Sequence, residues 1–278
     1  MKAAYRASLV FSAALLAACG ERAASASLQI RHPVDPTKVV EYFLERPAGN
    51  APWPTVVLLH GHQRWPRPGG RDFVDWGELD RLARRGYLAV AISQPGYGKS
   101  SGPADFGGAF TQQAVAGVIA ALRADGLAAP DGLLILGISR GALTAGLVAA
   151  QDSSVSGVVL VSGVYDLPAY VTAADASKAR EAVVAAIVAE TGGGTDALAA
   201  RSVLRRAGDI EAAVLILNGE KDDRTDPAQA RVLAERIANS GGTARAIVYP
   251  DFGHAIPVEV RNRDVDPFVD AVLRAAGR

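Results

Sequence analysis

Short apolar runs alternate with helical patterns along most of this chain, and this alternation constrains the fold more than any other feature. Each run is too brief for a helix and rich in Val, Ile and Leu, as a strand buried on both faces requires. The runs cover residues 55–59, 87–92, 133–136, 158–161, 214–217 and 246–249. Helical patterns lie near residues 73–85, 109–124, 141–150, 169–190, 226–239 and 265–276. The alternation predicts an α/β fold with a mostly parallel sheet and helices on both faces, preceded by an antiparallel strand at 38–45.

Composition and charge exclude several classes of protein. The 278 residues carry 29 basic and 29 acidic side chains and no long basic run, so we expect no nucleic-acid partner. Apolar residues make up 49% of the chain, which is enough for a core, and one cysteine permits no internal disulfide. We expect one domain over residues 28–278, and no cofactor.

Residues 1–18 have the pattern of a signal peptide. Lys2 and Arg6 precede an apolar stretch over 9–18, which is too short to span about 30 Å of hydrocarbon but suits a secretory segment. The stretch ends in Leu16-Ala17-Ala18-Cys19, which resembles the bacterial lipobox, in which the cysteine is lipidated.

Cys19 is therefore the expected lipidation site, and residues 19–27 the expected tether of a protein anchored in the cell envelope. Gly20 in place of an aspartate favours the periplasmic face of the outer membrane. The alternative is a secreted or periplasmic protein cleaved at Ala24-Ser25-Ala26, and in either case no membrane-spanning helix is needed downstream.

A nucleophile motif follows the run at 133–136. The sequence Gly137-Ile138-Ser139-Arg140-Gly141 is a G-x-S-x-G pentapeptide between a strand and a helix of small residues. A sharp strand-to-helix turn exposes the serine hydroxyl and requires neighbours without bulk, and the helix N-terminus stabilises developing negative charge. We therefore predict that Ser139 is a nucleophile, the alternative being a helix-capping serine in a Gly-rich turn.

A base and an acid follow two later strands. His254 comes after the run at 246–249, and Asp222 and Asp223 come after the run at 214–217. Because the carboxyl ends of parallel strands meet at one edge of a sheet, these side chains can reach Ser139. The order nucleophile, acid, base predicts a triad of Ser139, Asp222 and His254, with Asp223 as the other candidate for the acid.

The loop after the first buried strand predicts the oxyanion hole. It reads His60-Gly61-His62-Gln63, and the hole needs one backbone N–H from this loop and one from the residue after the serine. His62 and Arg140 are the expected donors, with Gln63 as the alternate to His62. A metal-binding interpretation of His60 and His62 lacks a third ligand nearby in the sequence, so we expect no metal.

Taken together, these motifs resemble the α/β-hydrolase superfamily over about residues 38–276. The segments that carry the resemblance are His60-Gly61-His62, 95–100, 137–141, Gly219-Glu220-Lys221-Asp222 and Asp251-Phe252-Gly253-His254. The Gly-x-x-Asp turn of the family favours Asp222 as the acid. Residues 201–203 and 214–223 resemble prolyl-oligopeptidase-type catalytic domains, whereas His60-Gly61-His62 is similar to the dienelactone-hydrolase and esterase branches. The resemblance implies a three-layer α/β-hydrolase fold.

The resemblance implies a serine hydrolase that works through an acyl-enzyme, and we expect a carboxylesterase acting on small or medium acyl esters. The alternatives are a serine peptidase of prolyl-oligopeptidase type and a lipid-anchored binding protein without catalysis. Residues 165–210 are longer than a minimal crossover and form either a small cap over the site or an ordinary crossover. The Arg140 guanidinium either faces the pocket and favours an anionic group or turns outward to a carboxylate.

Overall fold

The computed structural model describes residues 26–173 and 177–276, and its centre is one sheet. The sheet of the described chain has eight strands in the order β1-β2-β4-β3-β5-β6-β7-β8. The strands are β1 (Leu28–Arg31), β2 (Val39–Glu45), β3 (Trp53–Leu59), β4 (Leu88–Ile92), β5 (Ala128–Ile138), β6 (Val155–Val161), β7 (Ala213–Gly219) and β8 (Ala244–Tyr249). β1 and β2 are antiparallel to their neighbours, and all other pairs are parallel. The mostly parallel sheet predicted from the apolar runs is confirmed.

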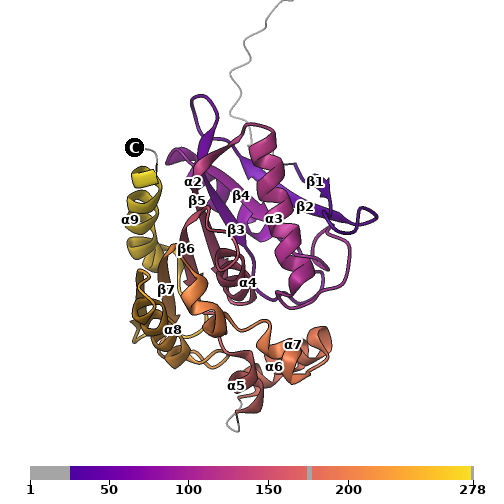
Figure 1. Cartoon of the computed structure of the whole chain (residues 1–278), viewed down its shortest axis with the longest axis vertical. Coiled ribbons are helices and arrows are strands. Elements are labelled where there is room, and N and C mark those ends of the chain that lie inside the picture. The colour runs from indigo at the N-terminus through magenta and orange to yellow at the C-terminus, as the bar shows by residue number, and fades with distance from the viewer. Residues whose placement is uncertain (1–25, 174–176, 277–278) are drawn as a thin grey trace, which may run out of the picture.

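Helices cover both faces of the sheet (Figure 1). They are α1 (Arg71–Asp75), α2 (Glu78–Arg84), α3 (Ala109–Ala124), α4 (Arg140–Ala149), α5 (Leu167–Thr172), α6 (Lys178–Thr191), α7 (Thr195–Ala199), the 3-10 helix η1 (Val203–Asp209), α8 (Pro227–Asn239) and α9 (Val258–Ala276). One apolar core lies between the sheet and α3, α4 and α8, and a second lies between the sheet and α1, α2 and α9. The expectation of helices on both faces is confirmed.

Two predicted helices are each divided in the structure. The segment near 73–85 forms α1 and α2, because Gly77 adopts a left-handed conformation with φ of 72°. The segment 169–190 forms α5 and α6, each with its own N-cap. Asp166 accepts from the Ala169 N–H and Ser177 accepts from the Arg180 N–H. Cap residues at these positions signal helix starts that the apolar period alone does not show.

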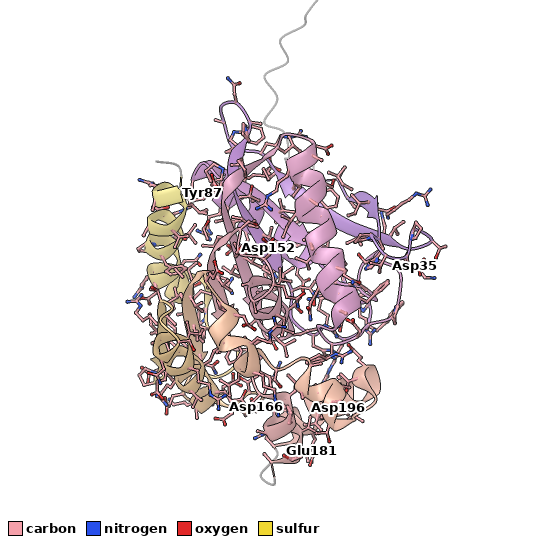
Figure 2. All side chains as sticks on the ribbon, viewed as in Figure 1. Asp35, Tyr87, Asp152, Asp166, Glu181 and Asp196 are labelled. Carbon is pink, nitrogen blue, oxygen red and sulfur yellow. The ribbon has the colours of Figure 1, made fainter. Side chains whose placement is uncertain are left out.

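Residues 165–210 form a helical insert that projects from one end of the sheet. It contains α5, α6, α7 and η1, of which α5, α6 and α7 lie at the foot of the molecule in Figure 1. Asp166, Glu181 and Asp196 mark this region in Figure 2. Ser177 Oγ donates to the carbonyl of Asp223, 2.5 Å away, so the insert borders the loop that follows β7.

Candidate active site

Ser139 occupies a sharp turn between β5 and α4. Its φ of 55° and ψ of −116° lie in a region that residues with a side chain rarely adopt. The Ser139 N–H donates to the carbonyl of Val161 on β6, 2.7 Å away. The turn therefore has the strained backbone that the G-x-S-x-G motif predicts for a nucleophile.

Backbone packing explains the two glycines of this motif. A Cβ at position 141 would lie 2.1 Å from the carbonyl oxygen of Leu59, and one at position 137 would lie 2.1 Å from the carbonyl oxygen of Gly141. Neither obstacle can rotate away, because both are main-chain atoms. The turn at Ser139 therefore packs closely against the start of α4 and the end of β3.

The loop after β3 lies directly against the nucleophile. A Cβ at Gly61 would be 3.3 Å from the Cβ of Ser139. Arg140 is the first residue of α4, where a helical N–H has no intrahelical acceptor. The two segments expected to supply oxyanion donors, around His62 and Arg140, therefore both adjoin Ser139.

His60 holds the main chain near this loop through two hydrogen bonds of its imidazole. Its imidazole is buried, its Nε2 accepts from the Gln94 N–H at 3.0 Å, and its Nδ1 donates to the Gly61 carbonyl at 2.8 Å. Burial lowers the pKa of His60 to about 3, so the ring is neutral. Both ring nitrogens are engaged, and the described residues contain no group of three His, Cys, Asp or Glu side chains able to hold a metal.

His254 and Asp222 meet at the carboxyl ends of β7 and β8. His254 Nδ1 lies 3.1 Å from Asp222 Oδ1 and 2.9 Å from Oδ2. A Cβ at Gly219 would lie 2.2 Å from the carbonyl oxygen of Phe252, so the two loops pack backbone to backbone. Ser162 Oγ donates to the His254 carbonyl at 3.0 Å and holds the loop from the β6 side.

The Asp222 carboxylate is held as an anion. Its side chain is 0% exposed and accepts from the N–H groups of Arg224 and Thr225, each at 2.9 Å, and from Thr225 Oγ1 at 2.5 Å. Burial raises the pKa of Asp222, but the hydrogen bonds from His254 and Thr225 outweigh it, so the pKa lies below its ordinary value. Asp223 is exposed, and the structure joins His254 to Asp222.

A small cavity of about 10 Å³ opens between Ser139 and the helical insert. Its lining includes Ser139, Arg140 and Phe106, together with Val183 from α6. The cavity has room for about one water molecule. Val183 of α6 therefore lines the same cavity as the nucleophile.

Two residues of this region were given no role from the sequence. Glu190, on α6, accepts a charged hydrogen bond from Arg140. Tyr97, in the loop after β4, is buried, and its hydroxyl lies 3.1 Å from His62 Nδ1. Tyr97 lies in the 95–100 segment that carries the resemblance, whereas Glu190 had no signal, because only the folded chain brings α6 to the turn at Ser139.

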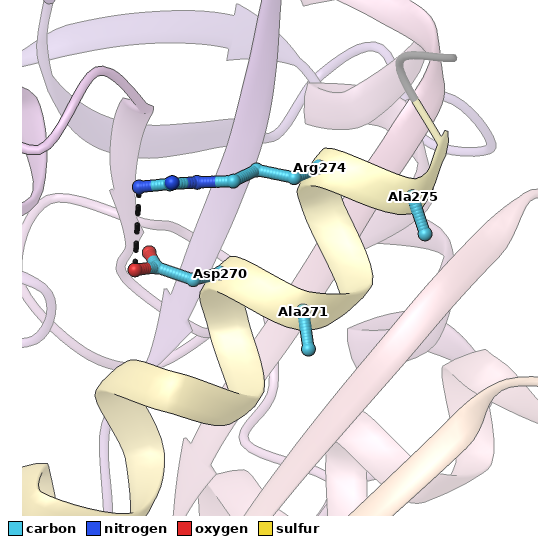
Figure 3. A pocket seen from close by; sticks show the side chains of 4 residues that line it. All are labelled: Asp270, Ala271, Arg274 and Ala275. Carbon is cyan, nitrogen blue, oxygen red and sulfur yellow. Dashed lines mark hydrogen bonds and ion pairs between the residues drawn. The ribbon is translucent and has the colours of Figure 1, made fainter.

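A larger hollow lies far from these residues in the fold. It measures about 500 Å³ and runs along α9, where Asp270, Ala271, Arg274 and Ala275 line it (Figure 3). Asp270 pairs with Arg85 at 2.8 Å and accepts from the Tyr87 hydroxyl at 2.5 Å. These contacts join α9 to the end of α2 and to the segment before β4, so the polar groups of the hollow have structural partners.

Cys19 and the predicted signal peptide at 1–18 lie outside the described residues, as does most of the predicted tether. Among the helices of residues 26–173 and 177–276, none is both long and apolar enough to cross a bilayer.

Comparison with known proteins finds a protein family that matches a large part of this chain. Residues 75–273 match the model of the prolyl oligopeptidase family. Dipeptidyl aminopeptidase BIII of Pseudoxanthomonas mexicana is 26% identical over 235 residues, which are 81% of this chain and 33% of that protein. The chain thus spans about a third of the length of this curated relative.

Solved structures share the architecture. An acylaminoacyl peptidase of Pyrococcus horikoshii superposes with a TM-score of 0.74 and 15% identity, over 90% of this chain and 42% of its own. A puromycin-hydrolyzing peptidase of Mycobacterium tuberculosis superposes with a TM-score of 0.73 and 21% identity, over 90% and 39%. The expected α/β-hydrolase fold is confirmed.

Proposed function

Because this chain belongs to the prolyl oligopeptidase family, we propose that it is a serine peptidase that cleaves short peptides through an acyl-enzyme on Ser139. The family supports a serine hydrolase and favours peptide bonds over the carboxylic esters expected from the sequence. The observation that carries the proposal is the His254–Asp222 pair, whose loop is bound by Ser162, the residue after the Val161 carbonyl that accepts from the Ser139 N–H.

In the proposed mechanism, Ser139 Oγ attacks the scissile carbonyl carbon while His254 Nε2 takes the hydroxyl proton. Asp222 accepts from Nδ1, which leaves Nε2 as the basic nitrogen and stabilises the imidazolium. The backbone N–H groups of Arg140 and His62 receive the oxyanion. His254 then gives its proton to the leaving amine, and a water molecule, activated in the same way, releases the acid.

The same steps cleave activated esters, since both reactions pass through one acyl-enzyme. Ester turnover therefore reports on the triad, and only the comparison of amide with ester substrates reports on the natural bond. We expect dipeptidyl p-nitroanilides to be cleaved at a measurable kcat/KM that is lost in Ser139→Ala, although the activated ester of the same acyl group reacts faster.

A fluorophosphonate probe tests the nucleophile directly. We expect the wild-type chain to be labelled and Ser139→Ala to be unlabelled, while the exposed Ser153→Ala serves as a matched control and labels fully. Failure of the folded wild-type chain to label would contradict the proposal and favour a binding protein without catalysis. Labelling with turnover of esters alone would favour a carboxylesterase.

We also propose that the protein is anchored in the cell envelope through lipid on Cys19. The lipobox-like Leu16-Ala17-Ala18-Cys19 supports this proposal. Mass spectrometry of the mature N-terminus tests it, and we expect an acylated Cys19. A mature chain that begins at unmodified Ser27 would instead support secretion.

A further inference from the structure

The Arg140 side chain lies buried beside the nucleophile rather than at the surface. Its side chain is 0% exposed, and it lines the same small cavity as Ser139. Its Nη1 donates to Glu190 Oε2 and to the Tyr97 hydroxyl, 3.2 Å away. The cation is thus held inside the site by one end of its guanidinium group.

Two aromatic rings fix the plane of this guanidinium. The Arg140 Cζ lies 4.9 Å from the centroid of Tyr97 and 5.1 Å from that of Phe106. Such contacts favour a cation over the ring faces. The orientation of the free donors is therefore set before any substrate arrives.

The opposite edge of the guanidinium has no partner. In the described part of the chain, Arg140 Nε and Nη2 are buried and make no hydrogen bond. Together these two nitrogens form the edge that binds a carboxylate with two parallel hydrogen bonds. Buried donors without acceptors are unfavourable, so a planar acceptor placed against this edge would stabilise it.

Cations outnumber carboxylates among the charges that act on His62 beside Arg140. Burial lowers the pKa of His62, and the guanidinium groups of Arg140, Arg67 and Arg64 lower it further, whereas the Glu190 carboxylate raises it. Arg67 also lies over Tyr97, with its Cζ 5.1 Å from the ring centroid. This corner of the site keeps an excess of positive charge after Glu190 has paired.

We propose that the free edge of Arg140 binds a carboxylate on the acyl part of the substrate, such as an acidic side chain on the residue that supplies the scissile carbonyl. This inference rests on the proposed function. Apolar side chains of Phe106, Leu143 and Val164 surround the path of the methylene groups. Because the cavity holds about one water, a substrate side chain has room only if the Val183 side chain shifts outward.

The test compares two substrates that differ only in charge, Ala-Glu and Ala-Gln p-nitroanilide, on the full chain. We expect the Glu substrate to be preferred about tenfold or more in kcat/KM, as for a charge-assisted bidentate contact. Arg140→Met should abolish this preference, so that the ratio of kcat/KM for the two substrates falls to about one. The double variant Arg140→Met/Glu190→Gln, which leaves no unpaired carboxylate, should behave in the same way.

Glu190→Gln should change the substrate preference in the opposite direction from Arg140→Met. Without the resident carboxylate the corner becomes more positive, so the Glu-over-Gln preference should rise. Glu181→Gln, at an exposed position of the same helix, is the matched control and should leave the preference unchanged. Equal rates on both substrates, or a preference that survives Arg140→Met, would overturn the inference.

A binding measurement tests the carboxylate subsite independently of the proposed peptidase activity. If neither anilide is cleaved, the peptidase proposal fails, and calorimetric titration with glutarate and with glutaramide, which carries no carboxylate, then decides the subsite alone. Tighter binding of glutarate that is lost in the double variant supports the carboxylate subsite. No difference between the two ligands contradicts it.

Discussion

At the carboxyl ends of the strands, main chain packs against main chain, whereas the helical insert is attached through side chains. Gly141 adjoins the Leu59 carbonyl, and Gly219 adjoins the Phe252 carbonyl. In the insert, Ile187 is the buried side chain of α6, and Glu190 contacts Arg140. The comparison indicates that main-chain contacts fix the turn carrying Ser139, whereas α6 is held by side chains, with Ile187 as its one buried residue.

The largest expected effect concerns the acid of the proposed triad. Asp222→Asn should lower kcat on a p-nitrophenyl ester about 10⁴-fold, because the amide cannot hold His254 in the required tautomer. Asp223→Asn removes a charge from the next residue, which is exposed, and should stay within about threefold of the wild type. A loss well beyond threefold in Asp223→Asn would contradict the assignment of Asp222 as the acid of the triad.

Adding one methyl group should lower the free energy of unfolding at the turn of Ser139 but not in the insert. Gly141→Ala should lower the free energy of unfolding by about 3 kcal/mol or more, since its Cβ would meet a fixed carbonyl oxygen. At Gly194 in the insert a Cβ has open space, so Gly194→Ala should change stability by less than about 0.5 kcal/mol. Urea unfolding measures both variants, and equal losses would refute the contrast.

Within the insert, stability should depend on one buried side chain. Ile187→Ala should lower the free energy of unfolding by about 2–4 kcal/mol, because it leaves a cavity beneath α6. Val188 is 40% exposed, and Val188→Ala should cost less than about 0.5 kcal/mol. If Ile187→Ala also leaves the free energy of unfolding unchanged, the packing of α6 contributes less to stability than its contacts indicate.

The smallest effect is a pH dependence that comes from His60. Its pKa of about 3 in the folded chain lies below the ordinary value of 6.5, so below pH 6.5 the unfolded chain binds a proton that the folded chain does not. Stability from the neutral ring is complete above about pH 6.5 and falls with decreasing pH, by at most about 1.4 kcal/mol per pH unit. Urea unfolding between pH 7 and pH 5 should show a shallower slope in His60→Gln, and an unchanged slope would mean that the ring is protonated when folded.

Much of the fold followed from the sequence because strand signals are local. The run at 214–217 lies inside β7, and the helix expected at 109–124 has the bounds of α3. The strand β1 was missed, because its four residues are mostly exposed and carry no apolar run. The division of 169–190 into two helices was missed because Ser177, a capping residue, does not interrupt the apolar period.

The sequence by itself determined the sheet and the positions of Ser139, Asp222 and His254 at strand ends, since apolar period and strand order are properties of neighbouring residues. Only the tertiary structure decided that Asp222 rather than Asp223 meets His254, and that Arg140 is buried with one edge free. These outcomes depend on contacts between residues far apart in the chain, such as Arg140 with Glu190. No local pattern encodes such distances, because they follow from how α6 packs over the finished sheet.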